Sequence, residues 1–330
     1  MPSTGPDRRR LGGSLLCLAL FVAAACSDGD GELERLVIPE GSSLQATSDT
    51  LAAHGVIRWP RLFELYVRLQ GADSDIKAGS YELRRGAGWS ESLAALVEGR
   101  VITLPVTIPE GWAIAQIAGR IAPIAQASED SIAVRLLDPG LADSLGVPGP
   151  TLEGYLFPET YRFAQGLSVE AVAVAMVDRY RDVWTDARRA ARDSLGLTER
   201  ELITLASIVQ AEARWEDEMP LISAVFHNRL RRPMRLQADP TVQYALESRQ
   251  SRLLFSHIDS VADNPYNTYT HDGLPPGPIG SPGLAAIDAA LHPAAVPYLY
   301  FVARADGRHE FSRSLREHNQ AIQRVRTQRR

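Results

Sequence analysis

The stretch TERELITLASIVQAEARWEDEMPLISAVFHNRLRRPMRLQADPTVQY, residues 198–244, decides the fold of the larger part of this chain. Thr198 followed three residues later by Glu201 is the pattern of a capping box, in which each side chain bonds the other residue's backbone N–H. Apolar residues then recur at three- and four-residue spacing, which indicates a buried helical face. At about 100° per residue, Glu212 falls at the edge of that face and Gln210 points away from it.

The position of Glu212 suggests a general acid. A carboxyl group held against an apolar face loses hydration, which raises its pKa and lets it keep a proton near neutral pH. Taken alone, Glu212 can equally be a solvated surface residue whose stem covers apolar atoms. Glu216 and Glu218 are the nearest competing acids, and Pro220 ends the helix close to them.

Two further helices are predicted after this one. Pro220 suits the first turn of a helix over residues 221–230, which Pro233 ends. Asp239 and Pro240 are typical of a cap and a first-turn proline for a third helix that runs through Tyr244. A polar set lies between the second and third helices and is expected to face the acid: Asn228, Arg229, Gln237 and Asp239.

Composition sets the general class. A chain of 330 residues that is 45% hydrophobic can bury a large core and is long enough for two domains. The net charge of -5 gives no reason to expect nucleic acid or an anionic membrane surface as a partner. Cys17 and Cys26 both precede the body of the protein, so no disulfide and no thiolate metal site is expected there.

The first 26 residues have the pattern of an export signal. Arg8, Arg9 and Arg10 precede an apolar run over residues 11–25, which is short for a membrane span of about 20 residues. Ala23-Ala24-Ala25-Cys26 resembles a bacterial lipoprotein cleavage site, although alanine stands three residues before Cys26 where leucine is usual. An ordinary cleaved signal and a single membrane anchor are the alternatives. All three place the body outside the cytoplasm, behind a polar linker over residues 27–35.

A small α+β module is predicted over residues 36–104. The sequence VIPEG at residues 37–41 returns as TIPEG at residues 107–111, and each copy leads into a helix, over residues 43–54 and 113–121. Between the two copies, residues 76–83 are typical of a strand, and residues 90–98 of a helix ended by Gly99.

Two later segments carry groups suited to sugars. LEGYLFPETY, residues 152–161, combines aromatic rings with acids such as Glu153, although Tyr155 and its aromatic neighbours are equally suited to the core. Residues 264–281 form a long Pro/Gly-rich loop of the kind that is often functional. Its Asn267, Thr268 and Tyr269 carry groups suited to an acetamido sugar. Residues 298–303 and 309–312 then predict a β-hairpin.

The sequence contains no motif for metal or cofactor chemistry. His227, His257 and His271 lack the spacing of ligands on one helix, so no metal site is predicted. No Gly-rich phosphate loop, nucleophile elbow or dinucleotide fingerprint is present, so no cofactor is predicted.

Several long motifs resemble one known family. LASIVQAEA, AVFHNRLRRPMRLQADPTVQY and YNTYTHDGLPPGPIGSPGLAAIDAALHP are similar to the YceG-like family of endolytic murein transglycosylases, and the resemblance extends over roughly residues 36–322. It implies an α+β protein with a LysM-like, glycan-binding module over residues 36–104. A mainly helical catalytic domain with a C-terminal β-hairpin would follow over residues 105–330. The family usually carries two acids spaced by one after its SIV segment, and this chain has Gln210 and Glu212 there.

The resemblance also implies an activity. A lytic transglycosylase cuts the bond between N-acetylmuramic acid and N-acetylglucosamine and leaves a 1,6-anhydro end, with Glu212 as its single acid and a bell-shaped pH profile. The predicted substrate-binding residues are Asn228, Gln237, Asp239, Asn267, Thr268, Tyr269, Glu153 and Tyr155. Glycan strands, and penicillin-binding synthases whose nascent strands the enzyme terminates, are the implied partners, with the membrane reached only through the N-terminal anchor. A hydrolase that uses Asp239 as a second acid, and a non-catalytic glycan-binding scaffold, are the alternatives.

Overall fold

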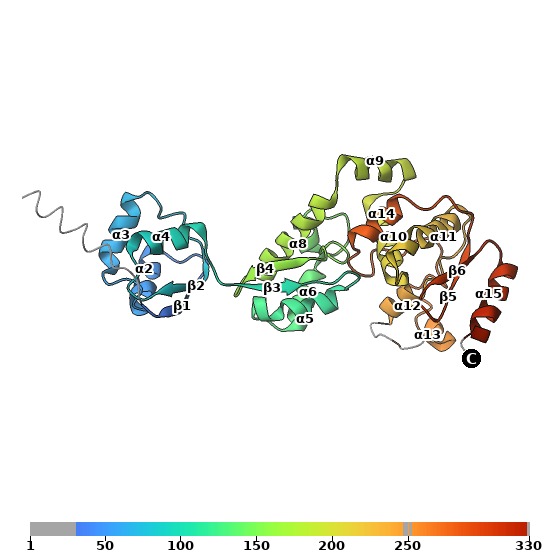
Figure 1. Ribbon diagram of the computed structural model, residues 1–330, viewed down its shortest axis with the longest axis horizontal. Coiled ribbons are helices and arrows are strands. Elements are labelled where there is room, and N and C mark those ends of the chain that lie inside the picture. Colours follow the sequence, from blue (N-terminus) through green and yellow to red (C-terminus); the bar gives the residue numbers. More distant parts are fainter. Residues whose placement is uncertain (1–30, 247–249, 251–252, 329–330) are drawn as a thin grey trace, which may run out of the picture. The chain divides into compact units, whose positions relative to one another are not determined.

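The computed structural model describes residues 31–246, 250 and 253–328 (Figure 1). The chain divides into two compact units, one comprising the chain up to Leu104 together with Arg162–Leu167, the other comprising Pro105–Tyr161 and the chain from Ser168 onward. The predicted export signal and the modification site at Cys26 lie outside the described residues. In the described part of the chain, no helix combines the length and the apolar character that crossing a bilayer requires.

The first unit is a small α+β body. Its elements are β1 (Leu33–Ile38), α2 (Leu44–Ala53), α3 (Pro60–Leu69), β2 (Gly79–Arg84) and α4 (Trp89–Glu98). The two strands pair in antiparallel fashion with Leu36 opposite Tyr81, and the helices bury Leu51, Phe63 and Leu96 against them. The predicted helices over residues 43–54 and 90–98 are confirmed, and the C-cap Gly99 has a left-handed φ of 73°. The sequence did not predict α3.

The second unit begins with short elements and then becomes mainly helical. The chain passes between the two units within β3 (Thr103–Thr107) and within β4 (Thr160–Ala164). The early helices of the second unit are α5 (Ile114–Ala125), α6 (Glu129–Leu136), α7 (Pro139–Ser144), α8 (Val169–Val183) and α9 (Asp186–Leu195). β3 and β4 form a two-stranded sheet. The later elements are α10 (Glu199–Glu212), the 3₁₀ turn η1 (Glu216–Glu218), α11 (Met219–Arg231), α12 (Asp239–Ala245), α13 (Phe255–Ser260) and α14 (Leu284–Leu291).

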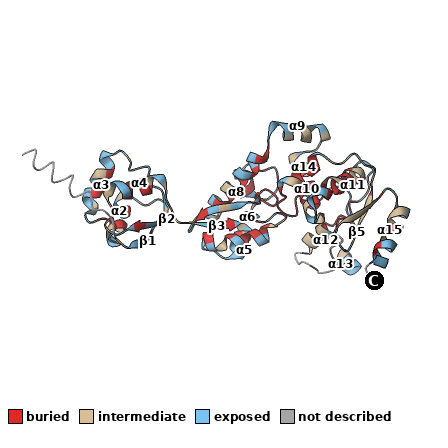
Figure 2. Ribbon diagram, in the orientation of Figure 1, coloured by how far each residue is buried: buried red, intermediate tan, exposed pale blue. Residues whose placement is uncertain are grey.

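Helix α10 is the centre of the second unit. Its predicted capping box is confirmed, because Thr198 N donates to Glu201 Oε2 at 2.8 Å and Glu201 N donates to Thr198 Oγ1 at 3.3 Å. The sequence predicted one apolar face, but every residue from Leu202 to Val209 is buried. The reason is that α11, α12 and α14 all pack against this helix (Figure 2).

The start of α12 differs from the prediction. Asp239 is its first helical residue, Ala238 occupies the N-cap position, and no side chain caps the helix there. Asp239 therefore does not act as a cap, and its exposed carboxylate is available for other contacts.

The predicted C-terminal hairpin is confirmed. β5 (Tyr300–Ala303) and β6 (His309–Ser312) pair in antiparallel fashion with Phe301 opposite Phe311. Helix α15 (Leu315–Gln328) packs against both strands. The chain is thus a mixed α+β protein, as the sequence predicted.

Candidate active site

Glu212 lies at the C-terminal end of α10. Its side chain is half-buried, and no described residue hydrogen bonds to its carboxyl group. Loss of hydration raises the pKa of Glu212 from its ordinary value to about 8, and the negative charge of Asp239 adds to this effect. The positive charge of Arg229 opposes it. Glu212 is therefore protonated at neutral pH, which is the state that a general acid requires.

Arg229 is a fixed cation near this carboxyl group. Burial among the surrounding groups lowers the pKa of Arg229, but an arginine stays charged. Its Nε donates to Leu299 O and its Nη1 to Leu236 O, both at 2.7 Å, and its guanidinium lies 5.3 Å from the ring centre of Tyr300. These contacts prevent Arg229 from swinging toward Glu212. It exerts a steady positive potential there without neutralising the acid in an ion pair.

Asp239 and Tyr269 form a second polar pair beside the acid. The Tyr269 hydroxyl donates to Asp239 Oδ1 at 2.5 Å. Burial, this hydrogen bond and the nearby negative charges, that of Glu212 among them, all raise the pKa of the Tyr269 phenol. The C-terminal end of α10 and the start of α12 thus meet the 264–281 loop here.

Asn267 and Thr268 are used within the protein. Both are fully buried. The Asn267 amide donates to Ile258 O at 2.9 Å and to Val261 O at 3.1 Å. Thr268 Oγ1 accepts from Ala238 N at 2.9 Å. The expectation that these two side chains contact a sugar is corrected, because their polar atoms face protein groups; they hold Tyr269 and the start of α12 in place instead.

Asn228 is also engaged with the backbone. Its Nδ2 donates to Val296 O and Tyr298 O, each at 2.8 Å, and its Oδ1 accepts from Arg231. Both ends of the amide are therefore occupied, and the predicted sugar contact is corrected to a role in fixing the segment before β5.

Gln237 is exposed and lies next to the start of α12. Its backbone has a left-handed φ of 46°, which is unfavourable for a residue with a side chain. The hydrogen bond from Gln237 N to Thr268 O at 3.1 Å helps to hold this conformation. No described residue hydrogen bonds to the Gln237 side chain, so its amide is available to a ligand.

Glu153 is a buried acid whose carboxyl group contacts the start of α5. Both carboxyl oxygens lie 3.2 Å from Ile114 N, and the Tyr244 hydroxyl donates to Oε2 at 3.3 Å. Burial raises the pKa of Glu153 to about 7, against the opposing effect of these hydrogen bonds. Tyr244 in turn packs against Tyr266, with 4.8 Å between ring centres. Glu153 thus connects α5 to α12 and to the 264–281 loop.

Tyr155 belongs to the core. It is fully buried and packs edge-on against Tyr180, with 5.3 Å between ring centres. The expectation that its ring stacks on a sugar is corrected, because the ring has no exposed face.

Gln210 bonds the segment that leads into α14. Its Oε1 accepts from Gly283 N at 2.9 Å, and Ser207 Oγ, one turn earlier, accepts from Ile279 N at 3.1 Å. This side of α10 therefore holds the loop that leads into α14. The position needs a hydrogen-bond acceptor, which a glutamine supplies as well as a glutamate does.

The competing acids near Glu212 have other surroundings. Glu218 is buried, and its carboxylate accepts from His309 N at 3.1 Å and lies 2.9 Å from His309 Nδ1, which fixes the start of β6. Glu216 is exposed and lies in η1, beyond the end of α10. Neither has the half-buried, unpartnered carboxyl group of Glu212.

Comparison with known proteins identifies the family. The YceG-like family model matches residues 36–324. The chain belongs to the YceG-like family.

Two relatives of this YceG-like chain are both named endolytic murein transglycosylase. The chain is 34% identical over 300 residues to the endolytic murein transglycosylase of Bacillus subtilis (strain 168), covering 86% of this chain and 82% of that protein. It is 30% identical over 318 residues to the endolytic murein transglycosylase of Streptococcus pneumoniae (strain ATCC BAA-255 / R6), covering 86% of this chain and 57% of that protein. A crystal structure of a YceG-like protein from Listeria monocytogenes is 33% identical, with a TM-score of 0.60 over 88% of this chain and 99% of that one.

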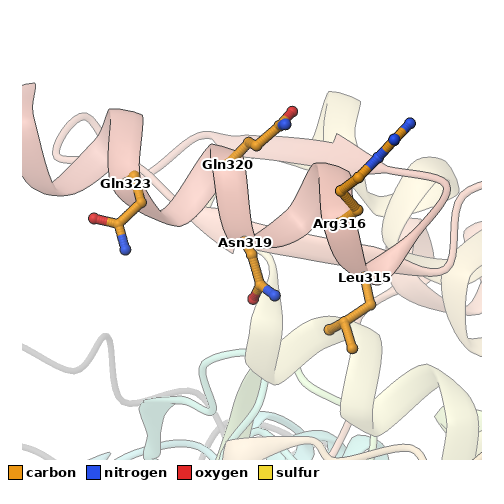
Figure 3. Close-up of a pocket in the computed structure, with 5 residues that line it drawn as sticks. All are labelled: Leu315, Arg316, Asn319, Gln320 and Gln323. Atoms are coloured by element: carbon orange, nitrogen blue, oxygen red, sulfur yellow. The ribbon is translucent and has the colours of Figure 1, made fainter.

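Other surface features of the YceG-like chain lie apart from Glu212. A hollow of about 670 Å³ follows α15 and is lined by Leu315, Arg316, Asn319, Gln320 and Gln323. These side chains come from a single helix and point in different directions from it (Figure 3). They do not converge on one point (Figure 3). No group of three or more potential metal ligands occurs in residues 31–246, 250 and 253–328.

Proposed function

We propose that this chain is a lytic transglycosylase that cuts the bond between N-acetylmuramic acid and N-acetylglucosamine in peptidoglycan and leaves a 1,6-anhydro end. The name shared by its relatives, endolytic murein transglycosylase, supports the substrate and the class of reaction. The observation that carries the proposal for this chain is the half-buried Glu212 carboxyl group, whose pKa of about 8 keeps it protonated at neutral pH.

The proposed reaction needs one carboxyl group. Protonated Glu212 donates its proton to the glycosidic oxygen as the bond from that oxygen to C1 of the muramic residue breaks. The Glu212 carboxylate then accepts the proton of the muramic C6 hydroxyl, while O6 forms its bond to C1. No water is consumed, and Glu212 ends as it began. A hydrolytic glycosidase differs because it needs a second carboxylate to act as nucleophile or to activate water.

The surroundings of Glu212 suit both steps. Burial and the Asp239 carboxylate favour the protonated form before the first step. The fixed charge of Arg229 then stabilises the carboxylate formed by that step. Because Arg229 is already held by Leu299 O and Leu236 O, it needs no rearrangement during the reaction.

The other predicted site residues take different parts in this proposal. Gln237, Asp239 and Tyr269 are proposed to contact the glycan next to the reacting bond, with the negative charge of Asp239 stabilising a developing oxocarbenium ion. Asn228, Asn267, Thr268 and Glu153 are proposed to position these groups, through the hydrogen bonds that they make within the protein.

A hydrolase is the second candidate. Asp239 is an exposed acid whose charge acts on Glu212, and a hydrolytic glycosidase uses a pair of carboxyl groups. The Tyr269 hydroxyl already donates to Asp239 Oδ1 at 2.5 Å, so this oxygen is occupied and a role as base or nucleophile is disfavoured. Hydrolysis and transglycosylation leave different ends, so the product distinguishes them.

The cellular role follows from the substrate. We place the protein in the cell envelope, held at the outer side of the cytoplasmic membrane by a lipid at Cys26 or by a single anchor, with the module over residues 36–104 binding glycan. Cutting nascent strands beside penicillin-binding synthases would terminate those strands.

Mass spectrometry of the muropeptides that residues 27–330 release from purified peptidoglycan tests the proposal, with the E212Q variant beside it. Anhydro-muramic ends from the wild type alone are the expected result. Reducing ends would make the protein a hydrolase. Binding without release by the wild type would leave a glycan-binding scaffold and overturn the proposal.

A further inference from the structure

Helix α3 presents an apolar stripe to solvent. Trp59, at its N-cap, is 48% exposed, and Leu62, Leu65 and Leu69 are 38%, 55% and 78% exposed. The three leucines recur at three- and four-residue spacing, so they share one side of the helix. The fully buried Val67 and its neighbours hold another side in the core of the first unit.

Unpaired positive charges flank this stripe. Arg58, Arg61 and Arg68 are exposed, and none has an ion pair or a guanidinium hydrogen bond with a residue in the described part of the chain. Three other exposed arginines of the first unit have ion pairs, Arg35 with Glu82, Arg85 with Glu34, and Arg100 with Glu98, while Arg84 donates to Gly31 O. The acid within α3, Glu64, is buried, so it offers no compensating charge at the surface.

We propose that α3 docks the first unit onto an anionic phospholipid surface, with Leu62, Leu65 and Leu69 among the acyl chains and Arg58, Arg61 and Arg68 against the headgroups. A helix with leucines on its exposed side, arginines along the edge and a tryptophan at one end has the pattern of a helix that lies in the membrane interface. Each arginine near an anionic bilayer favours binding at moderate salt. The net charge of the whole chain gave no reason to expect this, because the relevant charges are concentrated along one helix.

The sequence before β1 is consistent with this partner. If Cys26 or the apolar run before it is held in the membrane, the chain from Cys26 to Leu33 can extend over roughly 25 Å. The first unit would then stay within reach of the bilayer surface. A weak interfacial contact is enough under these conditions, because a short tether raises the effective concentration of the surface.

Other occupants fit less well. A second copy of α3 would bring the arginines of the two stripes together, and like charges repel. A glycan strand stacks on aromatic faces, whereas the stripe consists of leucines apart from Trp59.

Vesicle binding tests the proposal with residues 27–330, which retain both described cores but lack the leader. We expect this protein to float with phosphatidylcholine vesicles that contain phosphatidylglycerol, and to bind pure phosphatidylcholine vesicles at least about tenfold more weakly. An L65S/L69S variant should lose about tenfold or more of its binding, because two exposed apolar side chains that would enter the acyl chains are replaced. An R61E/R68E variant should lose the preference for phosphatidylglycerol, and raised salt should weaken wild-type binding.

The matched control is V134S/L137S in and just after α6, where exposed apolar residues lie beside Arg135, which is paired with Glu170. Its vesicle binding should equal that of the wild type. Unchanged cleavage of purified peptidoglycan and an unchanged melting temperature would show that the α3 variants are folded. The proposal would be overturned if the wild-type protein did not bind anionic vesicles. It would also be overturned if the α3 variants bound these vesicles as well as the wild type does. Dimerisation that requires the same leucines would assign the stripe to a second copy instead.

Discussion

The Tyr269 hydroxyl donates a 2.5 Å hydrogen bond to Oδ1 of Asp239, although 30 residues separate them in the chain. The bond joins the 264–281 loop to the first turn of α12. It also fixes a negative charge where that charge raises the pKa of Glu212. Acid strength at the end of α10 therefore depends on a contact between two other segments.

Replacing Glu212 by glutamine should remove the reaction while leaving the fold intact. Glutamine has nearly the same shape but cannot donate a proton to the glycosidic oxygen, so release of anhydro-muropeptides should fall by at least about 10²-fold. The rate of muropeptide release measures this effect. An E216Q variant, altered at an exposed acid, should keep the wild-type rate; equal loss in both variants would contradict the assignment.

The wild-type rate should decline as pH rises through about 8. The acid must carry its proton to react, and Glu212 loses that proton near its pKa of about 8. A profile of rate against pH on purified glycan strands measures this limb. A decline already complete by pH 6 would exclude Glu212, in the environment described here, as the proton donor.

Replacing Asp239 by asparagine should move that alkaline limb to lower pH. Asparagine can still accept from Tyr269, so the contact is preserved while the charge that raises the pKa of Glu212 is lost; a shift of up to about one pH unit is expected. The pH profile of a D263N variant, altered at an exposed acid just before the 264–281 loop, should not move. A D239N profile that coincides with that of the wild type would show that Asp239 does not set the acidity of Glu212.

The stability of E212Q should exceed that of the wild type at alkaline pH. Glu212 ionises near its ordinary value of 4.5 in the unfolded chain and near 8 in the folded protein. Between these values the folded state retains a proton that the unfolded state has lost, so wild-type stability falls as pH rises and levels off above about 8. Partial solvent access reduces the effect to the order of 1–2 kcal/mol. Urea unfolding at pH 4.5 and pH 8.5 measures it, with a difference between the variants expected only at the higher pH.

Replacing Gln210 should affect stability according to its hydrogen bond and not according to its charge. Q210E keeps an acceptor for Gly283 N and should retain activity within about threefold. Q210A leaves that N–H without its partner and should cost about 1–2 kcal/mol. Denaturant midpoints and rates of both variants test this. A large gain in rate for Q210E would mean that the first acid takes part in catalysis.

Glu153 should be required for the stability of the second unit. E153A leaves Ile114 N and the Tyr244 hydroxyl without their shared acceptor and should cost about 2 kcal/mol. The control is E159A, which breaks an exposed pair with Arg179 and should cost less than about 1 kcal/mol. Thermal unfolding of the two variants should therefore differ clearly, and equal melting temperatures would contradict the role of Glu153.

Local structure could be predicted where neighbouring residues determine it. The capping box at Thr198, the end of α4 at Gly99 and the hairpin of β5 and β6 each depend on contacts within a few residues of chain. The same is true of the acid, because the spacing of apolar residues in α10 already indicated an unusual environment for Glu212.

The tertiary structure decided which groups surround that acid. Arg229 and Asp239 act on Glu212, and Tyr269 holds Asp239, because α11, α12 and the 264–281 loop meet at the end of α10. The sequence predicted that Asn267 and Thr268 contact a sugar. Residue type alone does not show whether an amide or hydroxyl group faces solvent or other protein groups. Only the tertiary structure shows that these two side chains hydrogen bond to the backbone of Ile258, Val261 and Ala238. Residue spacing predicts which side of one helix or strand is buried. Contacts between residues distant in the chain depend on how the helices and strands pack together.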